Sequence, residues 1–179
     1  MRRFLRFDRS ADWVQLDVQT AQPYLVLRLL HDRNAGAKTT EIWAEAVCHG
    51  DVYTCLATDL GLGRQEAKEC WFKLVFAHSN AKSSARDAFD ARFPELGALF
   101  AEGKRMRHRD LAIRLQQYES HVMLERIVPR LAQLRIPTLT IHDSFIVPMA
   151  NAAAVERFMS EELVTYTDHP SVIRREGPT

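Results

Sequence analysis

Two stretches of the chain show the alternation of apolar and polar residues that is typical of strands. The first covers residues 12–18 (DWVQLDV) and predicts a strand with Asp17 near its end. The second covers residues 138–148 (TLTIHDSFIVP), where β-branched and apolar residues flank a charged pair. This pattern predicts a hairpin of two short strands joined at HDS, with Asp143 at its tip. The first β segment therefore carries Asp17 near its end, and the second carries Asp143 at its tip.

Helical patterns fill most of the chain between and after these strands. Helices are predicted over residues 20–30, 39–50, 64–78, 108–134 and 152–166, within 51–63, and on either side of Pro94. The helix at 39–50 is expected to end at Gly50, and the helix at 108–134 is expected to kink at Pro129. The polar tail at 168–179 is expected to be partly frayed. Helices around a few short strands predict an α+β fold.

Composition narrows the class of protein. Hydrophobic residues make up 46% and charged residues 26% of the 179 residues, which argues against a disordered or fibrous chain. The cysteines Cys48, Cys55 and Cys70 form no CxxC pair, which favours reduced thiols and a cytoplasmic protein. The opening MRRFLRF lacks a signal-peptide core, and no run reaches the roughly 18 apolar residues of a membrane span. No membrane partner is therefore expected.

Charge is informative only locally, because the formal net charge is +1. Basic residues cluster at 104–109 (KRMRHR), where Arg105 and Arg107 are candidates for binding nucleic-acid phosphates. The alternative interpretation is a solvated basic face, which is the commoner role of a charge run. The cluster alone does not identify a nucleic-acid partner.

The two strand-end aspartates are candidate metal ligands. An ionised carboxylate among apolar residues is costly unless a cation or hydrogen bonds compensate it. Mg²⁺ prefers carboxylate oxygens and binds through one or two carboxylates plus substrate phosphates. Asp17 and Asp143 on neighbouring strands would suffice for a two-metal site, which activates an attacking hydroxyl and stabilises a leaving phosphate oxygen. Taken singly, each aspartate is more typical of a turn or the surface.

A basic and aromatic face is predicted on the helix between the two aspartates. Arg64, Lys68, Phe72 and Phe76 are spaced by four residues and therefore share one helical face. Arginine and lysine can hold a triphosphate, and an aromatic ring further along can pack against sugar and base. The alternative is an ordinary amphipathic helix with Phe72 and Phe76 in the core and the cations pointing outward.

In this order, the segments resemble the palm and fingers of family A DNA polymerases, whose fold is shared by the single-subunit RNA polymerases of phages and mitochondria. LDVQTAQPYLVLRLL is similar to the family's first motif, with Asp17 at the metal position and Gln22 near the sugar. TIHDSFIV resembles the third motif and supplies His142, expected near the primer terminus, and Asp143, the second metal ligand. The carbonyl of Val18 is a further metal ligand that the resemblance implies.

The middle of the chain carries the rest of the resemblance. RQEAKECWFKLVF is similar to the fingers helix pattern R-x3-K-x3-F-x3-Y, with Phe76 replacing the tyrosine. GDVYTCLA resembles a segment beside the incoming nucleotide, which places Tyr53 there. FDARFPELGALF is similar to the segment F-x-x-R-Y-P-x-hydrophobic. LQQYESHVML, with Gln116, lies where the family has a glutamine-bearing helix that contacts the primer-template duplex.

The resemblance implies a polymerase-type palm over residues 1–179, in which helices pack a small antiparallel sheet and a reduced, fingers-like helical insertion covers about 32–110. It implies a template-directed nucleotidyltransferase that adds nucleotides to a primer 3′ end by two-metal-ion catalysis. The expected cofactor is a pair of Mg²⁺ ions, with Mn²⁺ as an alternative. The expected partners are a DNA primer-template, with RNA as an alternative, a nucleoside triphosphate, and a second protein that supplies the thumb function.

The departures from the family pattern keep a second function open. Gln22 stands where DNA-making members usually have a glutamate that crowds the ribose 2′-hydroxyl, and Ser144 replaces the usual glutamate of the third motif. The stretch before Asp17 is too short for a thumb, so processive synthesis by this chain alone is not expected. The alternative is a catalytically inactive or truncated polymerase-like module that binds nucleic acid or a partner protein.

Overall fold

A computed structural model describes residues 12–49, 51–78 and 84–177. The chain divides into two compact units. The sheet unit comprises Met1–Ala21 and Ser120–Thr179, and the helical unit comprises Gln22–Glu119. Two sequence predictions, on the opening MRRFLRF and on the helix end at Gly50, lie outside the described residues.

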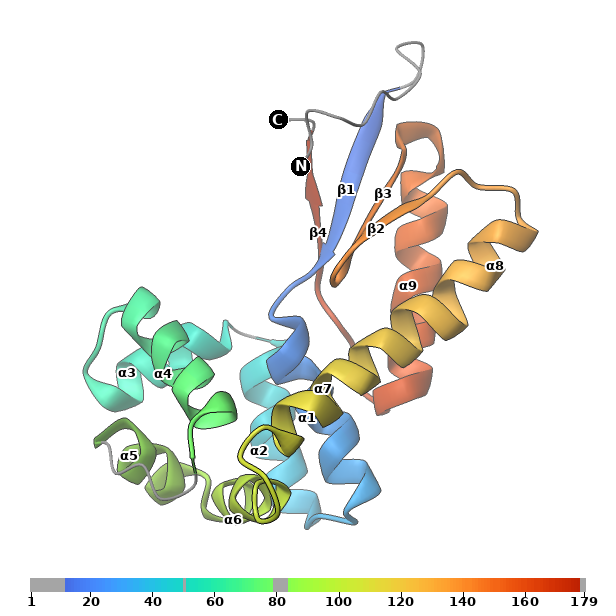
Figure 1. The fold of residues 1–179 in the computed structure, drawn as a ribbon. Helices are drawn as coiled ribbons and strands as arrows, with labels where there is room; N and C mark the ends of the chain where they lie inside the picture. The colour runs from blue at the N-terminus through green and yellow to red at the C-terminus, as the bar shows by residue number, and fades with distance from the viewer. Residues whose placement is uncertain (1–11, 50, 79–83, 178–179) are drawn as a thin grey trace. The chain divides into compact units, whose positions relative to one another are not determined.

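The sheet unit is built on four antiparallel strands in the order β2-β3-β1-β4 (Figure 1). The strands are β1 (Trp13–Val18), β2 (Leu139–Ile141), β3 (Ser144–Pro148) and β4 (Ile173–Glu176). The predicted strand and hairpin are confirmed. The prediction of a frayed tail is wrong for residues 173–176, because they pair with β1.

One face of β1 belongs to the core, and the opposite face carries its polar residues Gln15 and Asp17. Along β1 the buried residues Val14, Leu16 and Val18 alternate with half-buried ones, as expected when successive side chains point to opposite faces. Helix α9 (Ala152–Thr167) packs against β1 and β3 (Figure 1). Asp17 belongs to the opposite set, on the face that does not carry the buried residues of β1.

Within its described residues, the helical unit contains helices and the turns and loops that connect them, and no strand. In chain order they are α1 (Ala21–Asp32), α2 (Ala37–Cys48), α3 (Val52–Leu60), α4 (Arg64–Phe76), α5 (Ser84–Arg92), α6 (Pro94–Gly103) and α7 (Asp110–Ser120). Their core is aromatic: Trp43 stacks on Trp71 at a ring distance of 5.8 Å, and Phe89 stacks on Phe100 at 5.6 Å. Large buried rings contribute strongly to the stability of a small core.

The predicted irregularity at Pro129 takes the form of a π-helical segment. After α7, residues His121–Ile127 form η2 and Val128–Gln133 form α8. Pro129 has no N–H to donate, and in a regular helix its ring would crowd the carbonyl of Glu125. The wider π turns precede it, and the N–H of Val128 donates to the carbonyl of Met123, five residues back. Across the described stretches, none of the helices combines the length and the apolar character that spanning a membrane requires.

The structure therefore has an α+β fold with a small antiparallel sheet, as the sequence predicts.

Candidate functional site

The strand register brings the two predicted metal ligands to the same end of the sheet. Asp17 pairs with Ser144 across β1 and β3, and Asp143 directly precedes Ser144 in the hairpin turn. The backbone N–H of Val18 donates to the carbonyl of Asp143 at 3.2 Å, which ties the end of β1 to this turn. Asp17 and Asp143, which are 126 positions apart in the sequence, thus become neighbours.

Negative charges outweigh the one positive charge that acts on Asp17. The pKa of Asp17 is raised from 3.8 to about 6, mainly by burial and then by the negative charges of Asp143 and Glu176, whereas the positive charge of Arg174 lowers it. The influence of Asp143 means that the two carboxylates lie close enough to repel each other. A cation bound here would reverse the energetic cost of ionising Asp17.

The hairpin turn that carries Asp143 is held by specific bonds. Ser144 is only 2% exposed, and its hydroxyl donates to the carbonyl of Ile141 at 2.8 Å and accepts from the side-chain amide of Gln15 at 3.1 Å. His142, which is exposed, has a φ of +53°. A non-glycine residue in this region carries roughly 1–2 kcal/mol of strain, and such strain is frequent at functional sites.

Strand β4 contributes two charged residues that the sequence predictions missed. Arg174 pairs with Asp17, and Glu176 pairs with Gln15, so both lie on the same sheet face as Asp17. The Arg174 guanidinium donates through Nε to the side-chain oxygen of Gln19 at 3.0 Å. The adjacent β-branched pair Val172 and Ile173 is the sequence signal that could have indicated this strand.

The donor set fits a hard divalent cation. Two carboxylates at one sheet end, one of them with a raised pKa, match the ligands that Mg²⁺ takes when substrate phosphates complete its coordination. Within residues 12–49, 51–78 and 84–177, no group of three or more His, Cys, Asp or Glu side chains is arranged to hold a metal. Asp17 and Asp143 would therefore need oxygens from a substrate or solvent.

Helix α4 in the helical unit exposes its basic and aromatic face. Its buried residues are Ala67, Trp71, Leu74 and Val75. Phe72 and Phe76 are 40% and 39% exposed, and their ring centroids lie 6.1 Å apart. The alternative that placed both phenylalanines in the core is therefore wrong, because Trp71 and its buried neighbours occupy the inner side of the helix.

At the N-terminal end of α4, two of the predicted nucleotide-binding residues, Arg64 and Tyr53, lie close together. Arg64 is exposed, and its Nε lies 2.5 Å from Oδ2 of Asp51 while its guanidinium carbon lies 5.5 Å from the ring centroid of Tyr53. Asp51 also caps α3 by accepting from the N–H of Tyr53 at 3.1 Å. Although burial opposes it, the bonds from Arg64 and Tyr53 hold the pKa of Asp51 below its usual value. Lys68 is half-buried one turn further along α4.

The chain matches no protein-family model, and no curated protein matches it.

The remaining predicted residues of the helical unit have different environments. Gln116 and Arg105 are exposed, and exposed Arg107 forms an ion pair with Asp110 at 3.0 Å. The side-chain oxygen of Gln22 is buried and accepts no hydrogen bond from any residue that the structure describes. An unpaired buried acceptor costs about 1–3 kcal/mol.

Lys104 does not belong to the basic surface that the sequence predicts at 104–109. Its side chain is 4% exposed, and its ammonium donates to the carbonyls of Leu74 and Ala77. Burial, followed by the charge of Arg86, lowers its pKa from 10.5 to about 8. The C-terminal carbonyls of α4 attract a cation, which explains why this lysine is buried while Arg105 and Arg107 stay exposed.

Proposed function

We propose that this chain is a template-directed nucleotidyltransferase of the family A DNA polymerase type, which extends a primer by two-metal-ion catalysis. The observation that carries the proposal is the pairing of Asp17 with the hairpin turn that holds Asp143. Two carboxylates that repel each other at one end of a sheet are unfavourable for structure alone. They are favourable where cations and phosphates are bound during the reaction.

Asp17 and Asp143 are the proposed ligands of two Mg²⁺ ions, with the carbonyl of Val18 as a further ligand. When bound, such ions lower the pKa of a primer 3′-hydroxyl and neutralise the charge on the phosphates. The protein's own contribution is position: the pairing of β1 with β3 and the bonds of Ser144 hold the backbone that carries the two carboxylates. His142, exposed at the turn, is proposed to contact the primer terminus.

The exposed face of α4 is the proposed nucleotide-binding surface. Arg64 and Lys68 would neutralise the triphosphate, and the rings of Phe72 and Phe76 would pack against the base and sugar. The exposure of both rings supports this role, since exposed aromatic rings on a helix gain little for the fold. Tyr53, under the Arg64 guanidinium, would support that arginine. Gln22 is proposed to lie near the sugar of the nucleotide.

The proposed partners are a primer-template, of DNA or of RNA, and a second protein that grips the duplex. Gln116, Arg105 and Arg107 are the proposed contacts to the nucleic acid, and their exposure supports this role. A noncatalytic binding module is the second candidate. It is favoured by the Arg64–Asp51 ion pair, since an arginine already bound to a carboxylate attracts a triphosphate less strongly.

Primer extension tests the proposal. The Asp143→Asn variant should lose extension by roughly a thousandfold or more in Mg²⁺ or Mn²⁺, because the carboxylate that binds the metal is gone. Both dNTPs and NTPs should be supplied on DNA and RNA templates. Asp12→Asn is the matched control, since Asp12 is an exposed aspartate directly before the other end of β1 and should leave extension unchanged.

Circular dichroism melting of both variants separates loss of catalysis from loss of fold. If Asp143→Asn folds and extends primers at the wild-type rate, the catalytic assignment is wrong. If the wild-type chain binds primer-template but extends it under none of these conditions, the binding module is the better description.

A further inference from the structure

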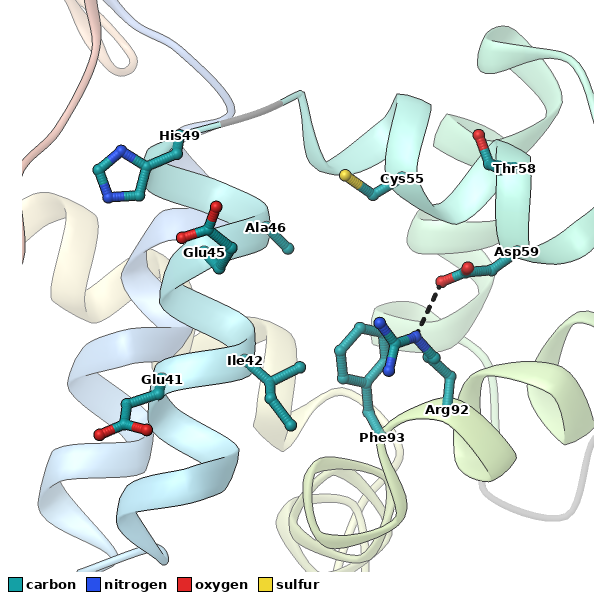
Figure 2. Close-up of a pocket in the computed structure, with 10 residues that line it drawn as sticks. All are labelled: Glu41, Ile42, Glu45, Ala46, His49, Cys55, Thr58, Asp59, Arg92 and Phe93. Atoms are coloured by element: carbon teal, nitrogen blue, oxygen red, sulfur yellow. Dashed lines mark hydrogen bonds and ion pairs between the residues drawn. The ribbon is translucent and has the colours of Figure 1, made fainter.

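Two hollows in the helical unit differ in the charges that line them. The larger, of about 650 Å³, lies beside α2, α3 and the junction of α5 with α6 (Figure 2), and its arginine, Arg92, is paired with Asp59 at 3.3 Å between Nε and Oδ2. The smaller, of about 440 Å³, is lined by α6, α7, the segment between them and Arg33. We call it the α6–α7 hollow. Both volumes fall within the roughly 300–1,000 Å³ of pockets that bind small molecules.

One face of α7 forms a wall of the α6–α7 hollow. The lining residues Asp110, Ile113, Arg114 and Gln117 are three or four residues apart from one turn to the next, so they share a helical face. The buried residues of α7, which include Leu115, lie on the other side of the helix. Arg114 therefore projects from the face of α7 that borders the hollow, and its side chain is exposed.

Both carboxylates that line the α6–α7 hollow already have an arginine as a partner. Nη1 of Arg33 lies 2.7 Å from Oε1 of Glu102, and Nε of Arg107 lies 3.0 Å from Oδ1 of Asp110. All four residues line the hollow. These two pairs cancel in charge, so the charge preference of the hollow depends on its other ionisable residues.

Two arginines of the α6–α7 hollow remain uncompensated. Neither Arg105 nor Arg114 forms an ion pair with a side chain in the described stretches 12–49, 51–78 and 84–177. Arg114 hydrogen-bonds to the hydroxyl of Tyr118, whose own proton is donated to Asp32 at 2.6 Å. A phenol is neutral, and a guanidinium keeps its proton at ordinary pH, so both arginines contribute a full positive charge.

We propose that the α6–α7 hollow binds the diphosphate group of a small molecule. The planar forks of Arg105 and Arg114 match pairs of phosphate oxygens, and their two charges offset much of the charge of a diphosphate. The hollow shares Arg105 with the proposed nucleic-acid contacts, but diphosphate binding does not require that the chain extend primers. A strand lying across the basic run 104–109 would use Arg109 as much as Arg105, whereas a ligand in the hollow would not, because Arg109 does not line it.

Calorimetric titration with inorganic pyrophosphate tests the proposal. EDTA is present, so that no divalent ion can link pyrophosphate to Asp17 and Asp143. Arg105→Gln and Arg114→Gln should each weaken binding by roughly tenfold, the size expected for the loss of charge-assisted hydrogen bonds. Arg109→Gln is the matched control, since it makes the same charge change in the same basic run and should weaken binding by less than about twofold.

A substitution of opposite charge effect guards against loss of fold. Glu102→Gln removes the partner of Arg33 and a negative charge from the lining, so pyrophosphate should bind several-fold more tightly. Damage to the fold would weaken binding instead. Glu69→Gln, an equal charge change at an exposed position of α4, should leave the affinity unchanged.

Methyl NMR locates the bound pyrophosphate. The methyl signals of Ile113, which lines the α6–α7 hollow, should shift during the titration. Those of Ile42, which lines the other hollow (Figure 2), should stay in place.

Four results would overturn the inference. They are a wild-type chain that does not bind pyrophosphate, equal weakening by Arg105→Gln and Arg109→Gln, no gain from Glu102→Gln, and shifts at Ile42 in place of Ile113. An Arg64→Gln variant separates this site from the proposed triphosphate contacts on α4. If binding is lost in Arg64→Gln and kept in Arg105→Gln, the pyrophosphate site is on α4 and the inference fails. Loss of primer extension in Asp143→Asn bears on the catalytic proposal alone, so the two proposals can fail independently.

Discussion

The sheet unit and the helical unit bring their candidate functional residues together in different ways. In the sheet unit, Asp17 meets Asp143 through the pairing of strands that are far apart in the sequence. In the helical unit, Phe72 and Phe76 share an exposed face because they lie four residues apart on one helix. A site built by strand pairing depends on the register of the whole sheet. A face built by helical spacing depends mainly on which side of the helix is buried.

The largest expected effect is the difference in stability between two neighbouring replacements on α4. Trp71→Ala should lower the free energy of unfolding by about 3–5 kcal/mol, because a large buried ring is removed from the core. Phe72→Ala, one position along, should lower it by less than about 1 kcal/mol, because that ring is largely in solvent. Urea denaturation followed by circular dichroism measures both.

Steady-state kinetics test whether Phe72 contacts the nucleotide. Phe72→Ala should raise KM for the nucleotide by about tenfold, the size expected for loss of a stacking contact. If Phe72→Ala destabilises the fold as much as Trp71→Ala, then the aromatic face of α4 is part of the core and not a binding surface.

The pH dependence of stability probes the sheet unit. The pKa of Asp17 is about 6 in the folded chain and ordinarily 3.8, so the folded state binds this proton more tightly than the unfolded state. The resulting stabilisation is complete below about pH 4 and is lost as the pH rises through about 6. Asp17→Asn should remove this loss, and melting temperatures between pH 4 and 8 measure it.

The same melting temperatures, measured with added Mg²⁺, test whether Asp17 binds a metal. Above pH 6, Mg²⁺ should raise the melting temperature of the wild-type chain and leave that of Asp17→Asn unchanged, because an ion that binds only the folded state stabilises it. Asp12→Asn should behave like the wild type. Parallel pH profiles for the wild type and Asp17→Asn would show that Asp17 has an ordinary pKa. Equal responses of the two chains to Mg²⁺ would show that Asp17 binds no metal.

The smallest expected effect concerns two adjacent arginines on β4. Arg174→Gln removes a positive charge opposite Asp17, so the pKa of Asp17 should rise by a fraction of a unit, which carbon-13 NMR of the carboxyl group measures. Arg175→Gln should leave the pKa of Asp17 unchanged, because Arg175 pairs with Glu156 of α9 at 2.5 Å. An equal shift in the pKa of Asp17 from both variants would mean that this pKa responds to the net charge of the protein and not to the position of Arg174.

The parts of the fold that depend on local pattern could be predicted from the sequence. The alternation at 13–18 and the spacing at 64–76 each identify an element and the face that it presents. The hairpin turn at His142 and Asp143 also followed from the residues around it. In the candidate site, the closeness of Asp17 and Asp143 was predictable because both were placed at strand ends.

The parts that depend on tertiary contact could not be predicted in this way. Strand β4 has only four residues, and its pairing with β1 decides its structure more than its own composition does. Arg174 and Glu176 were missed for this reason. Lys104 looked like part of a basic surface because its neighbours are arginines, and only the end of α4 determines its burial.

The central place of β1 also governs the order in which the chain can fold during synthesis. Residues 22–119 are continuous in the sequence, so the helical unit is fully synthesised while β1 still lacks both of its neighbours. The ribosome must deliver residues 144–148 and then 173–176 before the sheet is complete. Contacts between residues so distant in the sequence form slowly. The meeting of Asp17 with Asp143 is therefore a late folding event, and the carboxylate pair forms only once most of the chain has been made.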